Sequence, residues 1–240
     1  PMDQKKPLIS ANRSSEFNAF FNTESSKYLN RTDYQPSPTK KNLLWLEYSK
    51  GTAQDIDHAL HQLKSTKQST LLKFTNISQG KLMFGPIFPQ IKQHDHIKHF
   101  IIRQSYLSHD HTKQVGRILQ LNDGIAWLVL DHNKIDDKGV RHIAKGLEDN
   151  DSVLHVVLSD NQFGDAGAQA LTSAVQKHSK VQSLFMQGNL ISDHSVDSII
   201  HTIHTSKSLS VLDIRDNLLS DRSISYIKAE CAKKNIRCYG

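Results

Sequence analysis

The sequence predicts a right-handed α/β solenoid of about seven 28-residue repeats, with parallel strands along its concave face and helices along its convex face. Three observations support this fold. Asparagines recur every 28 residues without an insertion, apolar pairs with strand spacing precede them, and apolar pairs with helix spacing follow them. The asparagines are Asn133, Asn161, Asn189 and Asn217, each in a pattern of the form Leu-x-Leu-x-x-Asn-x-apolar.

A short strand is expected in the first half of each repeat. Two apolar columns, separated by one intervening residue, keep the 28-residue spacing even in repeats that lack the asparagine. The first column is Leu44, Leu72, Phe100, Leu128, Val156, Leu184 and Leu212; the second is Leu46, Phe74, Ile102, Leu130, Leu158, Met186 and Ile214. This alternation places both columns on one buried face of a strand, so the residues between and beside them point to the concave side.

A helix is expected in the second half of each repeat. Two further apolar columns lie four residues apart, which places them on one face of a helix. They are Ala59, Ile87, Val115, Ile143, Leu171, Ile199 and Ile227, and Leu63, Ile91, Leu119, Leu147, Val175, Ile203 and Cys231. The second repeat carries Pro86 and Pro89 in this half, so its helix is predicted to be short or broken.

The repeating asparagines are interpreted as structural. An Asn amide offers both a donor and an acceptor, so it can satisfy backbone groups where the chain leaves each strand. The first three repeats hold Ser49, Ile77 and Ser105 at this position, where the turn needs other partners.

Two segments are predicted. Residues 1–38 lie outside the register and form an N-terminal cap and linker, with Phe17, Phe20 and Phe21 covering the open end of the first repeat. Residues 39–240 form the solenoid, and Ile236 to Cys238 is expected to be a last partial strand.

The units LVLDHNKIDDKGVRHIAKGL and VVLSDNQFGDAGAQALTSAV closely resemble repeats of the ribonuclease-inhibitor-like leucine-rich-repeat family. The resemblance is strong from about Ile125 to Tyr226 and weaker back to Leu43. It implies a horseshoe that binds proteins, in a family that includes enzyme inhibitors and GTPase activators. The short, basic chain, rich in His and Lys, also looks like the leucine-rich-repeat effectors that intracellular bacteria inject into host cells.

The concave side of the predicted strands is expected to carry an apolar patch exposed to solvent, and an exposed cluster of this kind is typical of an interaction site. Arginines on its rim, like the tryptophans within it, are favoured interface anchors. The expected partner-binding residues are Trp127, Phe185, Val129, Val157, Ile101, Trp45, Arg103, Asp131, His155 and Arg215. The alternative is that both tryptophans pack against neighbouring strands or the N-terminal segment.

The sequence favours a non-enzymatic protein-binding module, possible roles being inhibition or regulation of an enzyme. No motif for catalysis or for a cofactor is present, and the His-Asp-His runs at His94 and His109 are read as coincidences among 14 histidines. The alternative is a GTPase activator using Arg103, Arg117, Arg141 or Arg215. The net charge of +6 permits a nucleic acid, but the concave columns mix both signs, which argues against one.

The expected location is cytoplasmic, because the sequence has neither a secretory signal nor a membrane-spanning apolar run. Injection by a bacterium into a host cytoplasm is compatible with this. The chain is expected to be a monomer on its own and to bind its partner protein on the concave face.

Overall fold

The computed structural model describes residues 43–49, 51–78 and 80–240. In this part of the chain, eight strands alternate with seven α-helices and one short 3-10 helix. The strands are β1 (Leu43–Ser49), β2 (Ser69–Thr75), β3 (Ile97–Arg103), β4 (Trp127–Val129), β5 (His155–Val157), β6 (Ser183–Phe185), β7 (Val211–Asp213) and β8 (Arg237–Tyr239). The helices are α3 (Ala53–Ser65), α4 (Gly80–Ile91), α5 (His109–Leu121), α6 (Asp137–Glu148), α7 (Asp165–Lys177), η1 (Asp193–Ser195), α8 (Val196–Thr205) and α9 (Asp221–Lys233).

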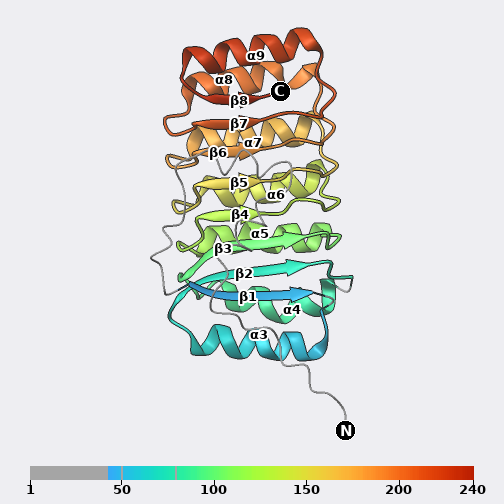
Figure 1. Cartoon of the computed structure of the whole chain (residues 1–240), viewed down its shortest axis with the longest axis vertical. Helices are drawn as coiled ribbons and strands as arrows, with labels where there is room; N and C mark the ends of the chain where they lie inside the picture. Colours follow the sequence, from blue (N-terminus) through green and yellow to red (C-terminus); the bar gives the residue numbers. More distant parts are fainter. Residues whose placement is uncertain (1–42, 50, 79) are drawn as a thin grey trace.

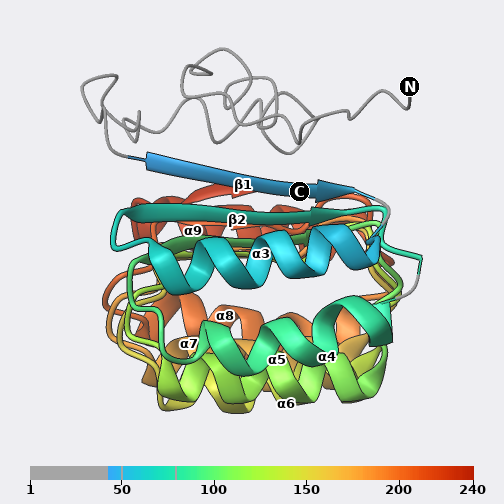
Figure 2. The ribbon, with the colours of Figure 1, turned by 90° about the horizontal axis from the view of Figure 1, so that it is seen from below.

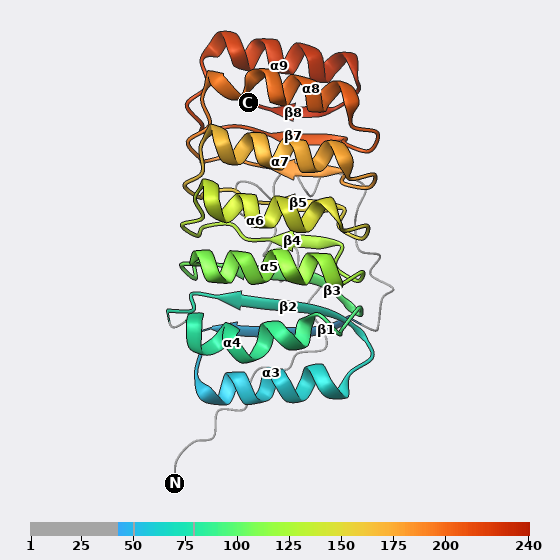
Figure 3. The same cartoon turned by 180° about the vertical axis from the view of Figure 1, so that it is seen from behind.

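The eight strands form one parallel sheet in which every strand pairs with its neighbours in sequence (Figure 1). Successive strands pair at the predicted repeat, so Leu128 lies opposite Val156 and Val156 opposite Leu184. The helices form a second layer on one side of this sheet (Figure 2), and the view from behind shows them stacked along the same axis (Figure 3). The predicted α/β solenoid is therefore confirmed, including the last partial strand, β8.

The core lies between the two layers, where all four predicted apolar columns meet. Thirteen of the fourteen strand residues in these columns are buried, Leu44 at the first strand being partly buried, and all fourteen helix residues are buried. Helix starts are fixed by side chains that accept from free backbone amides, such as Thr52 at α3 and Asp136 at α6. The periodicity of the sequence therefore determines both layers and their contact.

The repeating asparagines form the predicted ladder at the strand ends. The side-chain amide of Asn161 donates to the carbonyls of Leu130 and Leu158, each at 3.0 Å, and its side-chain oxygen accepts from the Ile135 amide at 3.1 Å. Each asparagine thus joins two successive repeats. In the third repeat Ser105 takes this place, and its hydroxyl accepts from the Ile77 amide at 3.1 Å.

Two further asparagines, which the sequence analysis missed, stabilise the turns that follow the helices. The Asn122 amide donates to the Ile91 carbonyl at 2.8 Å, and the Asn150 amide donates to the Leu119 carbonyl at 2.7 Å. Both side chains are buried. Their spacing is again that of the repeat, which was a usable signal in the sequence.

The prediction of a short or broken second helix is wrong. Helix α4 runs unbroken for 12 residues with Pro86 and Pro89 inside it. Its inner face buries Met83, Phe84 and Phe88 completely, with Ile87 and Ile91 beside them. This apolar burial outweighs the lost backbone bonds, because tertiary packing routinely overrides local helix propensity.

The predicted N-terminal cap, residues 1–38, lies outside the described residues, and so does the expected role of Phe17, Phe20 and Phe21. Within the part that is described, no helix has both the length and the apolar character needed to cross a membrane.

Candidate functional site: the concave face

The sheet face opposite the helices carries a second apolar cluster, separate from the core. We call it the concave patch; its buried members are Leu71, Ile101, Trp127, Val129, Val157, Phe185 and Val211. Strand alternation places these residues on the side away from the core columns. Five of them are predicted site residues, whereas Leu71 in β2 and Val211 in β7 are additional members that lie within the predicted span from Trp45 to Arg215.

Trp127 in β4 lies at the centre of a stack of three rings. The His155 ring in β5 stacks on the indole at a centroid distance of 3.8 Å, and the His99 ring in β3 lies on the other side at 6.2 Å. The strand register produces this stack, because His99, Trp127 and His155 are direct partners across the ladder.

The predicted site residue His155 is buried beside the indole, and its Nδ1 lies 3.0 Å from the Ser183 hydroxyl. Burial disfavours the charged imidazolium and lowers the pKa of His155 to about 4. The ring is therefore neutral near pH 7, and it contributes to the patch as an aromatic surface rather than as a charge.

The expectation that the patch is exposed to solvent is wrong. Trp127 retains 3% of its exposure and Phe185 retains 1%. Part of the reason is that equivalent side chains of adjacent strands are only about 4.8 Å apart and cover one another, as the ring stack shows. The polar residues along this face are also engaged, including His99, Arg103 and Gln187.

Two arginines on the rim are held by buried carboxylates. The Arg103 Nε donates to Asp131 Oδ2 at 2.8 Å, and the side chain of Asp131 is only 7% exposed. The Arg215 guanidinium makes two bonds to the fully buried Asp213, at 3.0 and 2.6 Å. These predicted site residues therefore form fixed charge pairs at the carboxyl ends of the strands.

The predicted tenth site residue, Trp45, lies in β1 opposite Leu71 in the strand register. Its side chain is outside the described residues. The structure therefore brings together nine of the ten predicted residues along one face, from β3 to β7, with Trp45 in the first strand of the same sheet.

A polar edge beside the patch was not predicted. His132 contacts Asp131 at 2.9 Å and Asp160 at 3.5 Å. The hydrogen bond that the His132 ring donates to the Asp131 carboxylate is the main cause that raises the pKa of His132 above its ordinary value. The residues at this edge share a left-handed backbone at the 28-residue spacing: Asn76, Gln104, His132, Asp160, Gly188 and Asp216.

The two His-Asp-His runs have separate surroundings. The His94 and His96 rings lie 5.0 Å apart, whereas His109 contacts Asp136 at 2.9 Å and His111 accepts from the Ser108 amide at 3.1 Å. In the described ranges, no group of three or more His, Cys, Asp or Glu is arranged to hold a metal ion.

Comparisons with known proteins agree with this fold. A family model for a leucine-rich repeat matches residues 149–171. No curated protein matches the sequence. The match falls on the repeat that contains β5 and α7, and the fold is a leucine-rich-repeat solenoid, which is typically a non-catalytic scaffold for binding proteins.

Two solved structures are distantly similar. One is actin-binding site 2 of leiomodin-1, with 18% identity, a TM-score of 0.40 and coverage of 43% of this chain and 62% of that chain. This chain therefore spans less than two thirds of the leiomodin chain. The other is an internalin from Listeria monocytogenes, with 12% identity, a TM-score of 0.28 and coverage of 72% and 74%.

Proposed function

We propose that this chain docks a partner protein through its concave patch and regulates that partner, most specifically by covering the active site of an enzyme. The observation that carries this proposal is the second apolar cluster itself. It lies on the far side of the sheet from the core, around Trp127 and Phe185. A cluster in that place is not needed to join the strands to the helices, and Trp-centred apolar surfaces flanked by arginines are typical interface centres.

A solenoid suits inhibition because its surface is preorganised. Strand ladders, asparagine bonds and the Arg103–Asp131 pair hold the side chains in place, so little conformational entropy is lost on binding. Eight strands about 4.8 Å apart span an ordinary protein interface. In this proposal the chain is a monomer of the ribonuclease-inhibitor type, and its partner is a host protein or a fellow effector if the chain is a bacterial effector.

A second candidate function is that of a GTPase activator. It requires an arginine that reaches into a partner's nucleotide site. Arg103 and Arg215 are on the correct face, but both are held by carboxylates, which weakens this candidate. The two functions differ in stoichiometry, because an inhibitor acts one copy per target whereas an activator turns over.

The test compares wild type with Trp127→Ala and Phe185→Ala in partner capture, followed by titration of each captured protein against purified variants. We expect Trp127→Ala to weaken binding by more than about 1 kcal/mol. Tyr226→Ala is the matched control, because Tyr226 is 49% exposed on α9, the helix layer.

Loss of Trp127 also opens a cavity, so unfolding of each variant is measured in parallel. Asp160→Lys provides a variant without a cavity, since this side chain is 38% exposed on the polar edge. A partner bound equally well by folded Trp127→Ala and Asp160→Lys, but lost by Tyr226→Ala, would place the interface on the helices and overturn the proposal.

A further inference from the structure

The two cysteines of the chain lie on consecutive elements, α9 and β8, seven residues apart in the sequence. Cys231 is in the last turn of α9 and is fully buried, while Cys238 is the middle residue of β8 and is partly buried against the same core. The preceding repeat has Ile203 at the position of Cys231, and Cys238 pairs with Leu212 in the strand register. The thiols thus replace a helix–strand contact that is purely aliphatic in the preceding repeat.

The connection between the two cysteines is a tight, ordered turn. The Lys234 and Ile236 amides both donate to the Cys231 carbonyl, at 3.0 and 2.9 Å. Asn235 between them has a left-handed backbone with φ of 57°. Ile236 is buried, and β8 is fixed by the Arg237 amide, which donates to the Ser210 carbonyl at 2.8 Å. The backbone therefore holds the two residues in place.

Both cysteine side chains pack in the same hydrophobic core, Cys231 from α9 and Cys238 from β8. The contact with Cys238 is the main cause that raises the pKa of Cys231, and the same contact lowers the pKa of Cys238. Burial and the charge of Asp213 oppose the Cys238 thiolate, whereas the charge of Lys228 favours it, and the net direction of the pKa is downward. Since the thiolate is the attacking species and Cys238 is the more exposed of the two, Cys238 is the thiol that reacts first.

We propose that Cys231 and Cys238 form a thiol–disulfide site that reacts with small disulfides of the glutathione type. The Cys238 thiolate attacks the disulfide, forms a mixed disulfide and releases one small thiol. The Cys231 thiol then loses its proton and its sulfur attacks that of Cys238, which releases the second small thiol. The protein gives up two protons and two electrons, and the small disulfide is reduced to two thiols.

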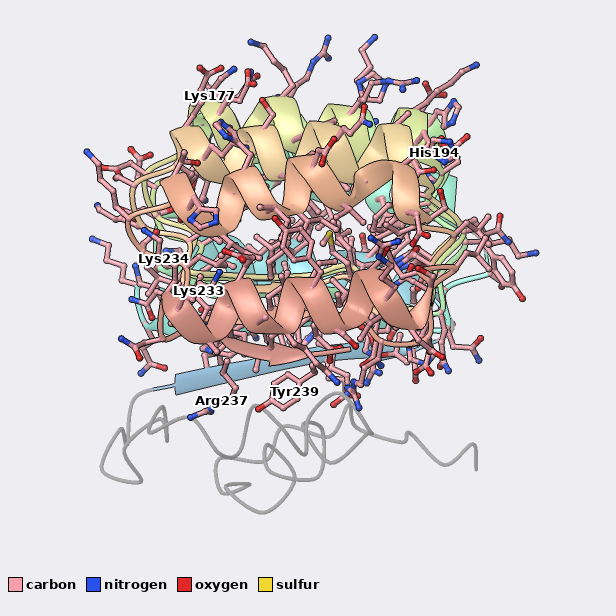
Figure 4. The ribbon with its side chains drawn as sticks, turned by 90° about the horizontal axis from the view of Figure 1, so that it is seen from above. Lys177, His194, Lys233, Lys234, Arg237 and Tyr239 are labelled. Carbon is pink, nitrogen blue, oxygen red and sulfur yellow. The ribbon has the colours of Figure 1, made fainter. Side chains whose placement is uncertain are left out.

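The bond would connect α9 to the edge strand that completes the concave face. Figure 4 shows Arg237 and Tyr239 of β8 on the side of the sheet away from α9. The Tyr239 ring packs against the concave patch, and the Arg215 guanidinium lies 5.7 Å from its centre. Oxidation would therefore fix the end of that face, although formation of the bond does not depend on the proposed function.

The experiment equilibrates the folded full-length chain with mixtures of reduced and oxidised glutathione near neutral pH, then quenches it in acid and alkylates the remaining thiols. Intact and peptide masses are measured for wild type, Cys238→Ser and Cys231→Ala. Wild type is expected to lose both free thiols, with an internal Cys231–Cys238 bond and no retained glutathione. Cys231→Ala, which keeps the reactive Cys238, is expected to carry one glutathione, and Cys238→Ser, which keeps only the buried Cys231, is expected to retain one free thiol.

Hydrogen exchange and thermal unfolding provide the second readout. Oxidised wild type is expected to unfold at a higher temperature than reduced wild type and to exchange the Arg237 amide several-fold more slowly. Dithiothreitol should remove both differences, and Cys238→Ser should show neither. If folded wild type holds only glutathione adducts or two free thiols at the most oxidising mixture, the proposal is wrong. An internal bond without slower exchange at Arg237 would overturn the link to β8.

Discussion

The first three strands and the last five differ in length, although the repeat is the same. β1, β2 and β3 each run for seven residues, whereas β4 to β8 run for three. Both regions turn at residues with a left-handed backbone, such as Gln104 in the first and His132 in the second. The difference in strand length coincides with the asparagine ladder, in which side-chain amides donate hydrogen bonds to the carbonyls of Leu130, Leu158 and Met186.

This comparison shows what the repeat motif encodes. In the second region, asparagine side chains take over hydrogen bonding where the short strands end. In the first region the chain builds the same turn with longer strands and with Ser105. The match to the leucine-rich-repeat model, residues 149–171, lies in the second region. The repeating asparagine therefore indicates how backbone groups are hydrogen-bonded at the strand ends. The apolar columns, which occur in both regions, predict the solenoid fold itself.

The largest effect is expected from Gly116→Ala, where the two regions join. A methyl group on Gly116 in α5 would lie 2.2 Å from the backbone oxygen of His142 in α6. A backbone atom cannot rotate away, so the helices must separate. We expect a loss of about 3 kcal/mol in the free energy of unfolding, measured by urea denaturation.

Gly85→Ala in α4 is the matched control within the first region. A methyl group there meets no atom within 4 Å, so the substitution should stabilise α4 by about 1 kcal/mol through helix propensity. Equal losses in both variants would contradict the idea that the α5–α6 junction is the tighter packing.

A smaller loss is expected from Asn161→Ala, which breaks the ladder in the second region. It leaves the Ile135 amide and two carbonyls buried without the side-chain partner. We expect a loss of about 2 kcal/mol in urea denaturation. Ser105→Ala in the first region removes the acceptor of the Ile77 amide and the donor to the Arg103 carbonyl, and should cost about 1 kcal/mol. If the serine variant proves the more damaging, the ladder is not what distinguishes the two regions.

The sequence was sufficient to predict the fold, because periodic burial is a local property that repeats. Four apolar columns fixed the register through all seven repeats, even where the asparagine is replaced by Ser49 or Ile77. Asn122 and Asn150 were predictable by the same spacing and were overlooked. The continuity of α4 was not predictable from Pro86 and Pro89, because it depends on tertiary burial of the Phe84 face.

The sequence predicted on which face of the sheet the proposed site residues lie, but not that the side chains of the concave patch are buried. Strand alternation places Trp127 and Phe185 on the concave face, and this follows from sequence alone. Their burial depends on how side chains of adjacent strands pack together, as in the stack of His99, Trp127 and His155, and the periodicity of the sequence does not encode this packing. The polar edge at His132 and Asp160 was also missed, because it follows from backbone turns rather than from the apolar pattern.

The last expected effect, comparable to that of Asn161→Ala, concerns acid and depends on buried histidines in both regions. Burial lowers the pKa of His155, in the second region, from 6.5 to about 4. Between these values the unfolded chain binds more protons than the folded chain, so stability falls as the pH drops through 6.5 and the loss is complete near pH 4. Burial also lowers the pKa values of His94, His96 and His111 in the first region.

His155→Gln separates the two contributions, because it removes the titrating group from the concave face and leaves the first region intact. At about pH 5, wild type should lose about 2 kcal/mol through His155 relative to neutral pH, and the variant should retain that amount. His201→Gln, at an exposed position on α8, serves as the control. The measurement is urea denaturation of each protein across this pH range. If acid sensitivity is unchanged in His155→Gln, the other histidines with lowered pKa values dominate it, namely those of the first region together with His142 and His178.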